Sequence, residues 1–99
     1  MANEIILLVD DNPTNLQMLF QLIEKSVECK LLIAKNGETA LSIARKTRPD
    51  LILLDIMMPG IDGFEVCRQL KADPATSRIP VIFLSALDET ATKVKGLQV

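Results

Sequence analysis

The sequence predicts a single α/β domain in which a parallel sheet carries helices on both of its faces. Short, unbroken apolar runs recur along the chain, and each ends in polar or turn-forming residues. Such runs are typical of strands that are buried on both faces of a parallel sheet. Segments with helical spacing of apolar residues separate the runs, and only a few residues connect them. The sequence has 99 residues, of which 48% are hydrophobic. This length and composition suffice for one domain with a hydrophobic core.

The first strand is expected at residues 5–9, where an apolar run leads into Asp10 and Asp11. Asn12 and Pro13 then favour the start of a helix, because Asn is a good N-cap and Pro suits the first helical position. This helix is expected to continue to about residue 27. Its inward face is marked by apolar residues at helical spacing, namely Leu16, Leu19, Phe20 and Ile23.

The second strand is expected at residues 30–34 and ends at the turn signal Asn36-Gly37. A short helix follows and ends near Arg45 and Lys46, since basic residues suit the last turn of a helix. The third strand, residues 51–54, runs directly into Asp55.

A turn rich in Pro and Gly follows Asp55, and Asp62 is placed to cap a helix at residues 63–72. The fourth strand is expected at residues 81–84, with Ser85 at its tip. A last helix, capped by Asp88, is expected to reach residue 99.

Parallel strands place all their carboxyl ends at one edge of the sheet, which is where open α/β sheets bind ligands. Asp10, Asp11, Asp55 and Ser85 should therefore lie close together. Three neighbouring carboxylates repel one another, and a hard cation such as Mg²⁺, which prefers oxygen ligands, relieves that repulsion. The sequence thus predicts a Mg²⁺ site beside a hydroxyl group. The alternative is that Asp55 only caps its strand or accepts hydrogen bonds from loop N–H groups.

Composition excludes several other classes of function. The net charge of −2 and the lack of a basic cluster argue against nucleic-acid binding. A zinc site is not expected, because the chain has no His and Cys29 and Cys67 are far apart. Two lone cysteines suit a reduced, cytoplasmic protein. The N-terminus lacks the basic region of a signal peptide, and no apolar run approaches the roughly 20 residues that span a bilayer, so no membrane contact is expected.

Three motifs in this order resemble the receiver domain of two-component response regulators, and the resemblance covers the whole chain. The motifs are Ile-Leu-Leu-Val-Asp10-Asp11, Leu-Leu-Asp55-Ile-Met-Met-Pro59-Gly-Ile-Asp-Gly63 and Phe-Leu-Ser85-Ala86. The resemblance implies a flavodoxin-like, doubly wound sheet with strand order 2-1-3-4.

The resemblance also implies a role for each site residue. Asp55 would accept a phosphoryl group from a histidine kinase or a phosphotransfer protein. Asp11 and Asp55 would bind Mg²⁺ directly, the backbone carbonyl of Met57 would be a third protein ligand, and Asp10 would act mostly through a bound water. Ser85 would hydrogen-bond a phosphoryl oxygen. The domain would be a signalling substrate that helps to catalyse its own modification, and not a turnover enzyme.

The family continues beyond the last expected helix with a fifth strand, which carries a lysine, and a fifth helix, and this sequence contains neither. We therefore expect residues 81–84 to form an edge strand through which two copies associate, with Phe83 and its strand neighbours between the chains. One alternative function is an interaction or dimerisation module with the receiver fold that is not phosphorylated. Another is an aspartyl-phosphate hydrolase, although that class usually has a second acid where Met57 stands here.

Overall fold

The computed structural model describes residues 4–26, 28–58 and 60–84. Every strand and helix expected within these residues is present, with bounds that differ from the predicted ones by a residue or so. Ser85 and the helix expected after Asp88 lie outside the described residues, as do residues 27 and 59. The elements are β1 (Glu4–Val9), α1 (Pro13–Ser26), β2 (Cys29–Ala34), α2 (Gly37–Thr47), β3 (Leu51–Asp55), α3 (Gly63–Ala72) and β4 (Val81–Leu84).

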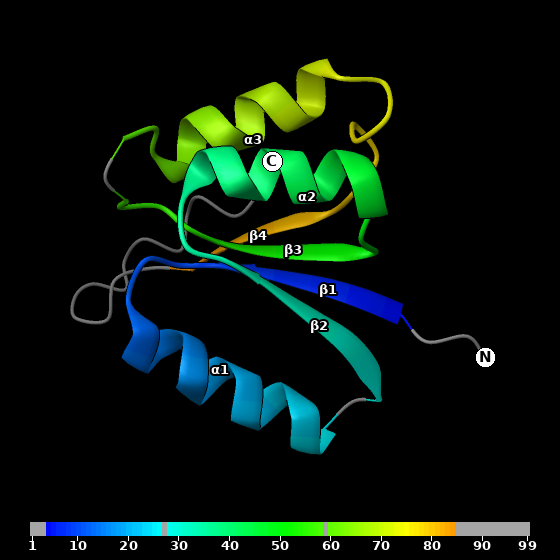
Figure 1. Ribbon diagram of the computed structural model, residues 1–99. Helices are drawn as coiled ribbons and strands as arrows, with labels where there is room; N and C mark the ends of the chain where they lie inside the picture. Colours follow the sequence, from blue (N-terminus) through cyan, green and yellow to red (C-terminus); the bar gives the residue numbers. More distant parts are fainter. Residues whose placement is uncertain (1–3, 27, 59, 85–99) are drawn as a thin grey trace.

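The strands form one parallel sheet in the order β2-β1-β3-β4, which confirms the predicted topology. Helix α1 covers one face of the sheet, and α2 and α3 lie together on the opposite face (Figure 1). Val9, the last residue of β1, is paired with Ala34 of β2 and with Leu54 of β3. The carboxyl ends of these three strands are therefore level with one another, and the residues that follow them share one edge of the sheet.

Alternate residues of the central strands enter two separate cores. Leu7 and Val9 of β1 point into the core shared with α2 and α3, while Ile6 and Leu8 join the core beneath α1. Burying one such side chain stabilises the fold by about 1.5–3 kcal/mol. This two-sided burial explains why the sequence of each central strand is a continuous apolar run. Among the described helices, none has the length and apolar character needed to cross a bilayer.

The side chain of Phe83 in β4 corrects one expectation. Phe83 is only 9% exposed and its ring packs against that of Phe64 in α3, with 5.0 Å between the ring centroids. Successive strand residues point to opposite faces, so Ile82 faces the other way and is 44% exposed. Phe83 is thus already buried within its own chain, and the exposed apolar residue of β4 is Ile82.

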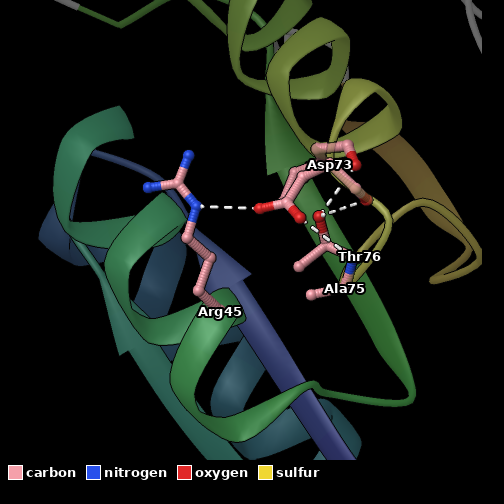
Figure 2. Close-up of polar contacts among 5 residues, drawn as sticks. Arg45, Asp73, Ala75 and Thr76 are labelled. Carbon is pink, nitrogen blue, oxygen red and sulfur yellow. Dashed lines mark hydrogen bonds and ion pairs between the residues drawn. The ribbon is translucent and has the colours of Figure 1, made fainter.

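The loop between α3 and β4 is held by side-chain hydrogen bonds (Figure 2). Asp73 accepts the backbone N–H of Ala75 at 2.9 Å and also pairs with Arg45 of α2, where Nε and Oδ2 are 3.2 Å apart. The buried hydroxyl of Thr76 donates to the carbonyl oxygen of Leu70 at 2.7 Å. These contacts fix the path of the chain from the end of α3 into β4.

Candidate functional site

Three carboxylates meet at the edge of the sheet where β1 and β3 end. Asp10 and Asp11 follow the last residue of β1, and Asp55 is the last residue of the neighbouring strand β3. One carboxylate oxygen from each lies within 4.8 Å of the others. The structure therefore brings together these three residues, as their positions after apolar runs predict.

Asp10 is the most deeply buried of the three, with only 3% of its surface exposed. Its Oδ1 accepts the backbone N–H of Asn12 at 2.9 Å, and its Oδ2 lies 3.4 Å from the side-chain amide nitrogen of Asn15. A buried carboxylate requires such donors, because an unpaired charge in the protein interior is strongly unfavourable. Asp11 in contrast is exposed to solvent.

Asp55 is half-buried, and its Oδ1 accepts the backbone N–H of Met57 at 3.3 Å. Burial is the main reason that its pKa is raised to about 6, and the negative charges of Asp10 and, less strongly, Asp11 add to this rise. The hydrogen bond from Met57 acts in the opposite direction because it favours the ionised form. Asp55 is therefore a carboxylate whose charge is poorly compensated by the chain itself.

A tight turn after β3 holds Asp55 in place. The N–H of Gly63 donates to the carbonyl oxygen of Ile56 at 2.9 Å, and Asp62 caps α3 by accepting the N–H of Glu65 at 2.9 Å. A Cβ atom on Gly63 would meet the carbonyl oxygen of Asp55 and lie 2.8 Å from Cα of Ile56. Only glycine lets α3 begin this close to the backbone of the strand tip.

The donor set fits a hard divalent cation. The cluster offers carboxylate oxygens, with no sulfur or imidazole ligand, and this is the set that Mg²⁺ prefers. Among the described residues, the ion pairs formed by basic side chains, Arg45 with Asp73 and Arg68 with Glu65, lie away from the cluster. A bound cation would compensate the mutual repulsion that contributes to the raised pKa of Asp55.

The outcome for the predicted residues is therefore uneven. Asp10, Asp11 and Asp55 converge, and Met57 touches the cluster through its backbone N–H. Ser85 lies outside the described residues. Sequence reasoning missed Asn15 and the steric role of Gly63. For Asn15 a signal was present, because a polar side chain in the first turn of a helix that follows an acidic strand tip can reach back to it.

The sequence is similar to those of known proteins. A family model described as the response regulator receiver domain matches residues 6–99. The response regulator PleD of Caulobacter vibrioides is 45% identical over 93 residues, which are 94% of this chain but only 20% of PleD. The protein PilH of Pseudomonas aeruginosa is 44% identical over 91 residues, covering 92% of this chain and 74% of PilH.

Solved structures show the same relationship. The N-terminal domain of a response regulator receiver protein from Methanoculleus marisnigri is similar with a TM-score of 0.82 and 36% identity, over 94% of this chain and 74% of that one. The receiver domain of the sensor histidine kinase PA1611 from Pseudomonas aeruginosa has a TM-score of 0.77 and 33% identity, over 96% of this chain and 73% of that one. That structure has a magnesium ion coordinated in its active-site cleft.

Proposed function

The chain belongs to the response regulator receiver domain family, and on this premise we propose that Asp55 accepts a phosphoryl group in a Mg²⁺-dependent reaction. The donor would be a histidine kinase or a phosphotransfer protein. The observation that carries the proposal is the convergence of Asp10, Asp11 and Asp55 within 4.8 Å at the carboxyl edge of the sheet.

The chemistry requires a nucleophile that is held still and partly shielded from water. An oxygen of the Asp55 carboxylate attacks the phosphorus of a phosphohistidine, so that an O–P bond forms while the P–N bond breaks. The bonding electron pair stays on the imidazole nitrogen, which takes up a proton, and Asp55 becomes an acyl phosphate. Catalysis of phosphoryl transfer is mostly positioning and charge stabilisation. The N–H of Met57 and the turn closed by Gly63 supply the positioning.

The residues that would hold Mg²⁺ are Asp11 and Asp55 directly, the backbone carbonyl of Met57, and Asp10 mostly through a water molecule. When bound, the cation would offset the negative charge of the carboxylates and of the incoming phosphoryl group. Support comes from the oxygen-only cluster and from the PA1611 receiver domain, which holds magnesium in its cleft. Ser85, one residue beyond β4, would donate its hydroxyl to a phosphoryl oxygen.

The proposed product is a signalling state, with the chain as a substrate that aids its own modification. We place this signalling in the cytoplasm, where a reducing environment keeps thiols such as those of Cys29 and Cys67 free. The chain spans about a fifth of the length of PleD.

Intact-mass spectrometry after incubation with acetyl phosphate and MgCl₂ tests the proposal. We expect a mass increase of one phosphoryl group in the parent and none in Asp55→Asn, a nearly isosteric variant. Asp62→Asn is the matched control, because it removes a nearby acid outside the cluster while Asn still caps α3. If the parent stays unmodified both with acetyl phosphate and with a phosphohistidine donor, the alternative of an interaction module that is not phosphorylated is favoured.

Association of two copies through β4 is a separate part of the proposal. Within the described residues β4 pairs only with β3, and Ile82 exposes 44% of its surface beside that edge. Light scattering at several concentrations should show a dimer that Ile82→Lys dissociates. A monomer throughout the micromolar range would contradict this part alone.

A further inference from the structure

A closed set of hydrogen bonds ties the first turn of α1 to the carboxylate of Asp10. The N–H of Asn12 donates to Asp10 Oδ1 at 2.9 Å, and Asn12 Oδ1 in turn accepts the backbone N–H of Asn15 at 3.2 Å. The side-chain amide of Asn15 returns to Asp10 Oδ2 at 3.4 Å. Because an ionised carboxylate only accepts hydrogen bonds, the group that Asn15 presents to it is its NH₂. Each oxygen of the most buried carboxylate thus has its own donor.

The helix itself determines where the Asn15 side chain points. Asn12 caps α1, since its side chain accepts the N–H groups of Thr14 and Asn15 and its carbonyl accepts that of Leu16. Helical side chains tilt toward the N-terminus of their helix. A residue in the first turn of α1 therefore reaches back toward the tip of β1, where Asp10 lies.

We propose that Asn15 is a positioning residue of the cation site, acting through Asp10 without touching the ion. Together with the N–H of Asn12 it fixes the rotation of the Asp10 carboxylate. One oxygen of Asp10 is thereby held within 4.8 Å of an oxygen of Asp11 and of an oxygen of Asp55. Outer-shell residues that orient the groups around a metal ion typically change metal affinity 10–100-fold when they are removed. The inference rests on the proposed function, because it requires the cluster to bind Mg²⁺.

Two variants of Asn15 distinguish the effect of losing the hydrogen-bond donor from the effect of losing side-chain packing. Asn15→Ala removes the donor and most of the side chain, whereas Asn15→Leu removes the donor but keeps the same branched set of side-chain heavy atoms, with a larger volume. Gln17→Ala is the matched control, because Gln17 is exposed on the same helix and makes none of these bonds. Isothermal titration with MgCl₂ gives the Kd, and thermal unfolding in EDTA reports the stability without metal.

We expect both Asn15 variants to raise the Kd for Mg²⁺ about tenfold while Gln17→Ala leaves it unchanged. This difference should persist at temperatures where all the proteins are fully folded. Binding within twofold of the parent by either Asn15 variant overturns the inference, because the donor would then be dispensable. If the parent itself takes up no Mg²⁺, the metal assignment of the proposed function fails, and the role of Asn15 fails with it.

Discussion

Asp55 at the end of β3 faces the negative charge of Asp10 at the end of β1, and burial together with this charge raises the pKa of Asp55 to about 6. The two strands are neighbours in the sheet, so the repulsion is built into the topology. Two acids held this close destabilise the fold unless a cation or a proton offsets their repulsion.

That cost can be measured with Asp55→Asn in EDTA. The pKa of Asp55 in the folded state lies above the ordinary value of 3.8, so the folded protein binds this proton more tightly than the unfolded chain does. The resulting stability is fully present below pH 3.8 and is lost as the pH rises through about 6. This pKa shift changes the free energy of unfolding by at most about 3 kcal/mol. Because Asp55 is partly exposed to solvent, the expected change is only about 1 kcal/mol.

At pH 7 we therefore expect metal-free Asp55→Asn to be more stable than the parent by about 1 kcal/mol, with the gain vanishing near pH 4. Urea unfolding followed by circular dichroism measures this, since the chain has no Trp or Tyr. Glu28→Gln is the control, because it also removes one negative charge, but from an exposed side chain. An equal gain at both pH values would show that charge is not its cause.

Removal of Asp11 should abolish most of the stabilisation by Mg²⁺. A ligand that binds only the folded state adds about 2.7 kcal/mol at a hundredfold excess over its Kd. Because Asp11 is exposed, Asp11→Asn should leave the metal-free protein almost unchanged. Thermal unfolding with and without MgCl₂ measures the difference. If millimolar Mg²⁺ does not change the Tm of the parent, the proposed metal site is wrong.

The parallel sheet and the acidic cluster could be predicted because both follow from local sequence, whereas the strand order was implied by the resemblance to receiver domains. An apolar run ending in Asp10 or Asp55 identifies a buried strand, and the parallel arrangement then places those residues at one edge. The contact of Asn15 with Asp10 depends on how α1 leaves β1, and the burial of Phe83 depends on the position of Phe64 in α3. The first contact was signalled only by a polar residue in the first turn of α1, and the second joins two elements that are distant in the sequence.

Gly63→Ala should damage both stability and the site. A methyl group at this position would press on the backbone of Asp55 and Ile56, which cannot move aside as a side chain can. Overpacking of this kind costs about 1–3 kcal/mol, and displacement of Asp55 should also weaken Mg²⁺ binding. Gly60→Ala is a useful contrast, because its Cβ would meet nothing within 4 Å while its φ of +81° still disfavours alanine. Urea unfolding and MgCl₂ titration of both variants test this, and unchanged Mg²⁺ affinity in Gly63→Ala would contradict it.

The last prediction compares two polar contacts in the loop between α3 and β4 (Figure 2). The ion pair of Arg45 with Asp73 is partly exposed to solvent, so Arg45→Ala should cost less than about 1 kcal/mol. Thr76 is 1% exposed, and its hydroxyl donates to the carbonyl of Leu70 near the end of α3. Thr76→Val keeps the shape of the side chain but removes this donor, so that the carbonyl of Leu70 keeps only the backbone N–H of Asp73 at 3.3 Å.

We expect Thr76→Val to destabilise the protein by about 1.5 kcal/mol, near the upper end for the net contribution of one hydrogen bond. Thr76→Ser keeps the hydroxyl and loses only a methyl group, so it should cost about 1 kcal/mol. Urea unfolding of the three variants ranks the contacts, and MgCl₂ titration should give the parent Kd for each, because the loop is remote from the carboxylates. A larger loss in Arg45→Ala than in Thr76→Val would mean that the ion pair, and not the buried hydroxyl, holds the approach to β4.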